Sequence, residues 1–149
     1  VIGVSYALLD LSEKFQADLS DCIVMETGGM KGRRKELTKT ELHDRLKRGL
    51  KVSEIHSEYG MTELLSQAYS LGGGYFSCPP WMKVLIREHN DPFNYSTTKS
   101  GGINVVDLAN TYSCSFIATQ DLGKTVGDQF EVLGRFDTAD IRGCNLLIQ

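Results

Sequence analysis

The fold of this chain is indicated most clearly by residues 38–50, TKTELHDRLKRGL. Thr38 and Glu41 are three residues apart, which is the spacing of a capping box at the start of a helix. Three leucines then recur every four residues, at Leu42, Leu46 and Leu50. This spacing places one apolar stripe on a helix. We therefore expect an amphipathic helix that begins after Thr38.

A predicted strand stands on each side of this helix. Residues 22–25, CIVM, are continuously apolar, as in strands buried on both faces, and residues 52–58, VSEIHSE, suit a second strand. The order strand, helix, strand predicts a parallel βαβ unit. Ligands of parallel sheets gather at the carboxyl ends of the strands. Gly28-Gly29 and Tyr59-Gly60 fall at those two ends.

The chain is expected to become β-rich after Gly72-Gly73-Gly74, a predicted boundary or turn. Four strands are predicted, separated by Gly and Pro turns, at residues 82–87, 103–107, 115–119 and 130–133. The fold class is therefore α/β. Residues 1–74 are expected to form a nucleotide-binding parallel βαβ layer, and residues 75–149 a small, distorted antiparallel β region.

Composition excludes several classes of protein. A length of 149 residues is enough to bury a core, and a net charge of -3 lacks the basic footprint of a nucleic-acid partner. No apolar run reaches the roughly 18 residues of a membrane span. Residues 1–9, VIGVSYALL, lack the basic start of a signal peptide and are predicted as a strand. The four cysteines show no CxxC spacing, which argues against a zinc site or disulfide framework and favours the cytoplasm.

Residues 59–63, YGMTE, combine side chains that suit a nucleotide. The ring of Tyr59 can stack on a purine, and Gly60 lets the backbone come close. The hydroxyl of Thr62 can bond a phosphate oxygen, and the carboxylate of Glu63 can hold Mg²⁺. The alternative is purely structural: Thr62 is the N-cap of a helix whose first turn contains Glu63.

Two shorter motifs follow predicted strands, TQDL at 119–122 and GRFD at 134–137. A carboxylate at a strand end, such as Asp121, can accept two hydrogen bonds from ribose hydroxyls. Arg135 offers a fixed fork of donors to ribose or phosphate oxygens. The alternatives are an ordinary turn aspartate and a surface salt bridge.

Two further features have both a functional and a structural interpretation. Cys144 lies close to Arg142, and a neighbouring cation favours the nucleophilic thiolate. A lone cysteine is otherwise a small buried apolar residue. The basic residues of 31–35, KGRRK, can reach a triphosphate or a coenzyme A phosphate, or they form a solvated loop.

In this order, the motifs resemble those of the adenylate-forming superfamily, whose members activate carboxylic acids with ATP as acyl-adenylates. The resemblance implies that Gly28 and Gly29 line the adenine. It also implies that Tyr59, followed by Gly60, stacks on the adenine, that Thr62 contacts phosphate and that Glu63 serves Mg²⁺.

The second half of the chain carries the rest of the resemblance. It implies that Asp121 holds the ribose hydroxyls, that Arg135 contacts the ribose, and that Asp137 is the pivot of a C-terminal lid. Gln120 stands where the superfamily has glycine, so the local turn is expected to differ.

Within the superfamily, residues 25–33, METGGMKGR, and 140–146, DIRGCNL, resemble the acyl-protein synthetase (LuxE-type) branch. Members transfer an activated fatty acyl group to a cysteine near their C-terminus and then to a partner such as an acyl reductase. Cys144 matches that cysteine. Two rivals stay open: a phenylacetate-type ligase acting on aryl or acyl groups, which transfers them to coenzyme A, and a non-catalytic nucleotide-binding module.

The resemblance also implies that residues 1–149 are the C-terminal portion of a larger enzyme and are inactive alone. The phosphate loop of the superfamily precedes the matched segments, and its lid lysine follows the hinge.

Overall fold

The computed structural model describes residues 1–15, 17–30, 33–35, 37–89 and 91–136. The chain divides after Pro79 into two compact units, Val1–Pro79 and Pro80–Gln149. The first contains helices on a mostly parallel sheet and the second contains antiparallel strands. The predicted α/β fold class is confirmed.

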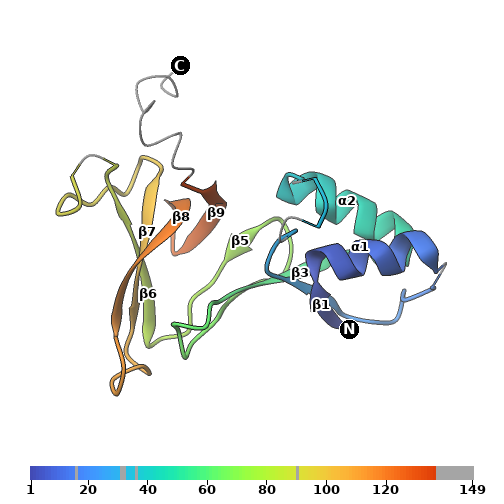
Figure 1. Cartoon of the computed structure of the whole chain (residues 1–149), viewed down its shortest axis with the longest axis horizontal. Coiled ribbons are helices and arrows are strands. Elements are labelled where there is room, and N and C mark those ends of the chain that lie inside the picture. Colours follow the sequence, from blue (N-terminus) through green and yellow to red (C-terminus); the bar gives the residue numbers. More distant parts are fainter. Residues whose placement is uncertain (16, 31–32, 36, 90, 137–149) are drawn as a thin grey trace. The chain divides into compact units, whose positions relative to one another are not determined.

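The sheet of the first unit has four strands in sequence order (Figure 1). They are β1 (Ile2–Val4), β2 (Val24–Thr27), β3 (Ile55–Tyr59) and β4 (Ala68–Ser70). The strands β1, β2 and β3 are parallel, and β4 is antiparallel to β3. The helix α2 (Lys39–Leu50) connects β2 to β3. This confirms the predicted parallel βαβ unit. A short strand, β5 (Tyr75–Phe76), follows β4.

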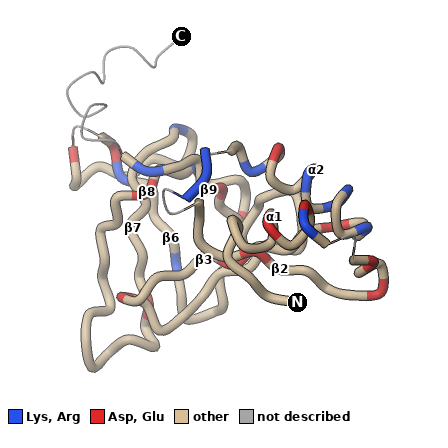
Figure 2. The backbone as a smooth tube through the Cα atoms, turned by 45° about the vertical axis from the view of Figure 1, so that its right-hand side comes forward, with Lys and Arg blue, Asp and Glu red and all other residues tan. Residues whose placement is uncertain are grey.

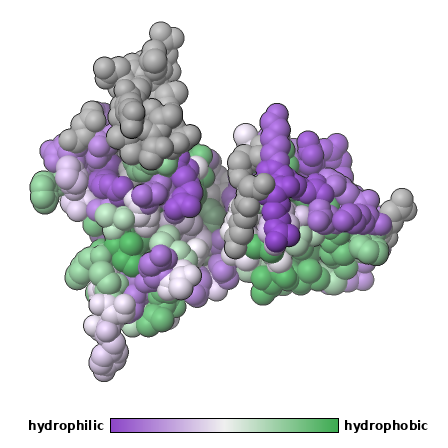
Figure 3. Space-filling view, in the orientation of Figure 1, coloured by the Kyte–Doolittle hydropathy of each residue, from purple (hydrophilic) through white to green (hydrophobic). Residues whose placement is uncertain are grey.

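The helix α2 begins where its sequence predicts. The Thr38 side chain accepts a hydrogen bond from the Glu41 N–H, and the Glu41 carboxylate accepts one from the Thr38 N–H. The three leucines of the stripe are buried, and hydrophilic residues cover the surface where α2 lies (Figure 3). The helix ends at Lys51 in the left-handed conformation.

The N-terminal prediction is only partly right. Residues 2–4 form β1, but the chain then turns into a helix, α1 (Ser5–Lys14). Leu8 and Leu9 of α1 enter the same buried cluster as the leucines of α2. The two helices approach closely, because a Cβ on Gly49 of α2 would lie 2.7 Å from the Cβ of Ser12. In the described part of the chain, no helix has the length and apolarity to cross a bilayer.

The second unit is an antiparallel meander in which neighbours in sequence are neighbours in the sheet. Its strands are β6 (Met82–Arg87), β7 (Gly101–Asp107), β8 (Phe116–Val126) and β9 (Gln129–Arg135). All four predicted strands are present. Ile86, Ile103, Val105 and Phe130 form part of its buried interior.

The strand β8 is longer than predicted, and this changes the setting of Asp121. Sequence reasoning placed Asp121 at a strand end or in a turn, but it lies inside β8. The strand continues past Asp121 because β7 and β9 pair with it on both sides. Gly123 permits this close pairing, since a Cβ there would lie 2.7 Å from the Glu131 carbonyl oxygen.

Candidate functional site

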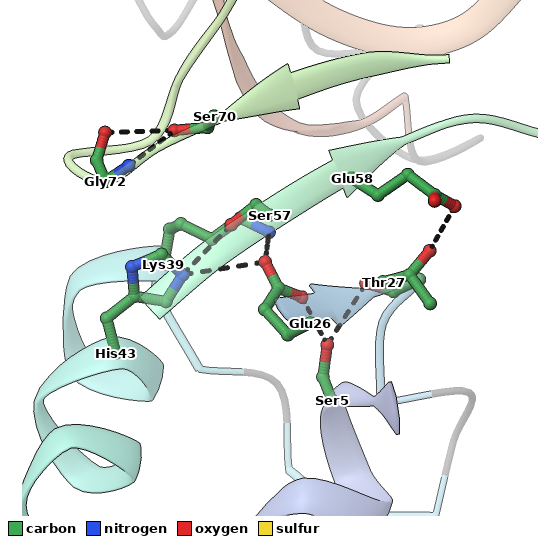
Figure 4. Close-up of polar contacts among 10 residues, drawn as sticks. Ser5, Glu26, Thr27, Lys39, His43, Ser57, Glu58, Ser70 and Gly72 are labelled. Carbon is green, nitrogen blue, oxygen red and sulfur yellow. Dashed lines mark hydrogen bonds and ion pairs between the residues drawn. The ribbon is translucent and has the colours of Figure 1, made fainter. Parts of the chain in front are cut away.

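The predicted residues of the first unit gather at one edge of its sheet. Gly28-Gly29 follows β2, and Tyr59 is the last residue of β3. These strands are parallel neighbours, so their carboxyl ends lie at the same edge. The Thr27 hydroxyl donates a hydrogen bond of 3.1 Å to the Glu58 carboxylate and ties the two ends together (Figure 4).

The two glycines after β2 have different roles. Gly28 has φ = 68°, a left-handed conformation that glycine adopts without the clash of a Cβ. Gly29 is set in open space, with no atom within 4 Å of where a Cβ would be. Gly28 therefore makes the turn, and Gly29 leaves its backbone open to a close approach.

A buried polar network supports this turn (Figure 4). The carboxylate of Glu26 is 0% exposed. It accepts hydrogen bonds from the Ser5 hydroxyl (2.8 Å) and from Lys39 Nζ, and His43 Nε2 lies 3.5 Å from it. The Ser5 hydroxyl also lies 3.2 Å from the Gly28 carbonyl oxygen. The network thus joins α1, β2 and α2 beneath the turn.

The charge of Glu26 is set by its neighbours. Burial raises the pKa of a carboxyl group because it disfavours the charged form. At Glu26, burial is outweighed by hydrogen bonds from His43, Lys39 and Ser57 and by the charge of Lys39, and the pKa falls from 4.5 to about 2. Glu26 is therefore ionised at neutral pH, and its buried position suits a supporting role rather than contact with a ligand.

The Tyr59 side chain is mostly buried, so its ring is not freely accessible for stacking. Its side chain is 8% exposed, and its ring meets that of Phe76 edge-on, with 6.0 Å between the centroids. Lys39 Nζ lies 5.9 Å from the centroid of the same Phe76 ring. Tyr59 is therefore connected through Phe76 to the Glu26 network, and stacking of a base on it requires part of this packing to open.

Thr62 and Glu63 lie in an exposed turn between β3 and β4. The Leu64 N–H donates to the Met61 carbonyl oxygen at 3.1 Å and closes the turn. The alternative interpretation, in which Thr62 caps a helix, is wrong, because β4 begins at Ala68 without an intervening helix. Both residues are exposed.

A single carboxylate such as Glu63 suits Mg²⁺ only together with other oxygens. Within the described ranges, no three His, Cys, Asp or Glu side chains come together as metal ligands. Mg²⁺ commonly takes one or two carboxylates and completes its shell with water and substrate phosphates. The exposed Glu63 is compatible with this arrangement.

In the second unit, Asp121 and Arg135 are partners across β8 and β9. The Arg135 Nε lies 3.4 Å from the Asp121 Oδ1. The Asp121 side chain is 16% exposed and that of Arg135 is 75% exposed. The carboxylate is thus held at the sheet surface, and the guanidinium extends into solvent.

A one-residue shift in the register of β8 with β9 creates this pair. Near the tip of the hairpin, Gly123 is opposite Val132. One residue further on, the register has shifted and Leu122 is opposite Gly134. Such a bulge inserts one extra residue on one strand and turns later side chains to the other face. It brings Asp121 and Arg135 opposite each other.

No protein-family model and no curated protein matches the chain. Solved structures do match it over 90% of its length. A mutant form of coronafacic acid ligase from Pectobacterium brasiliense has a TM-score of 0.65 at 19% identity, with 29% of that chain covered. A benzoate CoA ligase from Burkholderia xenovorans has a TM-score of 0.61 at 15% identity, with 30% covered. Fatty acyl-adenylate ligases from E. coli and L. pneumophila have a TM-score of 0.60 at 13% identity, with 33% covered.

The chain shares its fold with part of these ligases. It spans about a third of the length of the solved structures that it matches. At these identities the comparison shows the fold, and the roles of individual residues depend on their own geometry.

Two residues of the basic cluster beside Gly28-Gly29, Arg33 and Arg34, contact α1. Arg34 forms ion pairs with Asp10 and Glu13, and the Arg33 guanidinium lies 5.0 Å from the centroid of the Tyr6 ring. Figure 2 shows charges of both signs along α1 and α2. For Arg33 and Arg34 these contacts favour the structural interpretation over a phosphate site.

Two predicted residues, Asp137 and Cys144, lie outside the described residues. Sequence reasoning also missed the role of Glu26. A carboxylate directly after the apolar run 22–25 was a usable signal, because a charge in a buried strand requires partners.

Proposed function

We propose that this chain supplies the nucleotide-positioning part of an ATP-dependent enzyme that activates carboxylic acids as acyl-adenylates. The observation that carries the proposal is the fold match over 90% of the chain to ligases that include benzoate CoA and fatty acyl-adenylate ligases. The three motifs support it as well, because they follow one another in the sequence in the order that the superfamily has.

In the second unit, Asp121 accepts hydrogen bonds from the two ribose hydroxyls. A carboxylate offers about four acceptor sites, so Asp121 can bind two ribose hydroxyls alongside contacts within the protein such as the ion pair with Arg135. Arg135 is well exposed, so its guanidinium can turn toward ribose or phosphate oxygens.

In the first unit, the backbone at Gly28-Gly29 and the ring of Tyr59 contact the adenine. The exposed Thr62 hydroxyl donates to a phosphate oxygen, and Glu63 contributes a ligand to the Mg²⁺ that accompanies ATP. The Glu26 network keeps the Gly28 turn in place through Ser5.

The acyl acceptor in this proposal is Cys144. A carboxylate is a poor acyl donor, and attachment of AMP provides a good leaving group. The thiolate of Cys144 attacks the acyl carbon, the bond from that carbon to the phosphate oxygen breaks, and AMP leaves with the electron pair. The thioester then passes its acyl group to a partner protein such as an acyl reductase.

A second candidate is a phenylacetate-type ligase that transfers the acyl group to coenzyme A. It is favoured by the match to a benzoate CoA ligase and needs no cysteine nucleophile. A third candidate is a non-catalytic module that binds AMP without turnover.

The acceptor is tested by the mass of the undigested full-length protein after incubation with ATP, Mg²⁺ and palmitate in the absence of coenzyme A. We expect a hydroxylamine-labile acyl adduct that is lost in Cys144→Ser and kept in Cys22→Ser, a matched change at an exposed thiol. If no adduct forms, but acyl-CoA appears once coenzyme A is added, the result would instead establish the coenzyme A ligase.

A further inference from the structure

Arg87, the last residue of β6, connects three strands of the second unit. Its guanidinium donates hydrogen bonds to the Ile103 carbonyl oxygen (3.0 Å) and to the Asn104 side-chain oxygen (2.6 Å) on β7. A third bond, of 2.6 Å, reaches the Thr119 carbonyl oxygen on β8. Arg87 therefore crosses its neighbouring strand to reach the next one.

The Arg87 side chain can cross β7 and reach β8 because Gly102 has no side chain. Arg87 and Gly102 are partners in the β6–β7 register. A Cβ on Gly102 would lie 2.7 Å from the Arg87 Nε, which is closer than real Cβ contacts come. The guanidinium thus lies directly on the backbone of β7.

Through Thr119, whose carbonyl oxygen is the third acceptor, Arg87 is connected to Asp121. The Thr119 hydroxyl donates to the Ile103 carbonyl oxygen at 2.9 Å, so Arg87 and Thr119 share that acceptor. The same hydroxyl oxygen accepts a bond of 3.1 Å from the Asp121 N–H. Arg87 fixes the Thr119 backbone, and Thr119 fixes the backbone of Asp121.

Arg87 also contacts Phe136, the residue after Arg135. Its guanidinium lies 5.6 Å from the centroid of the Phe136 ring, and His89 packs edge-on against that ring. The Phe136 N–H donates to the Gln120 carbonyl oxygen at 2.8 Å. The guanidinium thus supports the backbone beside both members of the Asp121–Arg135 pair.

We propose that Arg87 is a positioning residue that fixes the Asp121–Arg135 pair at the geometry needed for ribose. This rests on the proposed function for the identity of the ligand. The position requires guanidinium, because lysine carries its charge at a single point and lacks the planar fork that reaches three acceptors and lies over Phe136.

The test is Arg87→Lys in the intact protein, with AMP calorimetry and amide hydrogen exchange measured on the same samples. We expect AMP affinity to fall by about tenfold, as for loss of hydrogen bonds to a charged group. We also expect faster exchange at the Asp121 and Phe136 amides. Lys83→Ala, at an exposed side chain on the same strand, should change neither. If Arg87→Lys does not fold, Asn104→Ala removes one acceptor and should give a smaller effect in the same direction.

The outcomes separate the two claims. Unchanged affinity and unchanged exchange in a folded Arg87→Lys variant would overturn the positioning role and leave the proposed function standing. Failure of the wild-type protein to bind AMP would overturn the proposed function and, with it, the ribose role of Arg87. Lower thermal stability with unchanged AMP affinity would show that Arg87 is purely structural.

Discussion

Arg135 lies opposite Asp121 across β8 and β9, with 3.4 Å between its Nε and the Asp121 Oδ1. The arginine is 75% exposed, and exposed ion pairs contribute little to stability. The pair can therefore be altered without unfolding the sheet, which makes it suitable for functional tests.

We expect Asp121→Ala to weaken AMP binding by at least about tenfold, because two charge-assisted hydrogen bonds to ribose are lost. The melting temperature should change little. Calorimetry with AMP measures the first quantity and circular dichroism the second. Lys124→Ala is the matched control, since it removes another surface ion pair of the same hairpin, with Glu131 at 2.9 Å. Equal affinities in the wild type and Asp121→Ala would remove Asp121 from the site.

The two glycines after β2 should respond differently to alanine. Gly28→Ala forces a Cβ into a left-handed conformation and should lower the free energy of unfolding by about 1–2 kcal/mol. Gly29→Ala enters open space and should change it by less than about 0.5 kcal/mol, while AMP affinity falls if the backbone there meets the nucleotide. Urea titrations and AMP calorimetry measure these effects. Similar destabilisation by both changes would contradict the assigned roles.

Glu26 should make stability depend on pH. Its pKa lies near 2 in the folded protein, below the ordinary value of 4.5. The unfolded chain therefore takes up the proton first as pH falls, and the stabilisation present above pH 4.5 is lost progressively toward pH 2. The free energy of unfolding should fall by up to about 1.4 kcal/mol per pH unit across this range.

Urea titrations between pH 6 and pH 3 test this directly. Glu26→Gln should be less stable at neutral pH, because Lys39 loses its charged partner, and its stability should depend less on pH. Glu54→Gln, which removes one exposed carboxylate, is the matched control. An unchanged slope in Glu26→Gln would show that another group is responsible.

The capping box should account for part of the stability of α2. Thr38→Ala removes the acceptor for the Glu41 N–H and should cost about 1 kcal/mol of unfolding free energy. Thr40→Ala, in the exposed first turn of the same helix, is the control and should be neutral or slightly stabilising. Thermal denaturation compares the two variants, and equal melting temperatures would contradict a capping role.

The helix α2 and its flanking strands were predictable because their signals are local. Thr38, Glu41 and the leucine stripe lie within one stretch of sequence. The helix α1 was not predictable in this way, because Val4 offers no capping side chain and the approach to α2 depends on a contact with Gly49, far away in the chain.

The residue types of the candidate site were predictable from the sequence, but their spatial arrangement was not. The turn at Gly127-Asp128 indicates a hairpin, yet a regular hairpin would not place Asp121 opposite Arg135. That partnership depends on the register shift between Leu122 and Gly123 in the pairing of β8 with β9. Enclosure of Tyr59 by Phe76 likewise depends on a contact between distant segments.

The measurement that tests acyl activation most directly is exchange of labelled pyrophosphate into ATP by the full-length protein, with and without a panel of fatty and aromatic carboxylic acids. Reversible adenylation predicts exchange that requires one of the acids and that falls strongly in Asp121→Ala. Absence of acid-dependent exchange from a folded protein that binds AMP would contradict acyl activation and identify a nucleotide-binding module without catalysis.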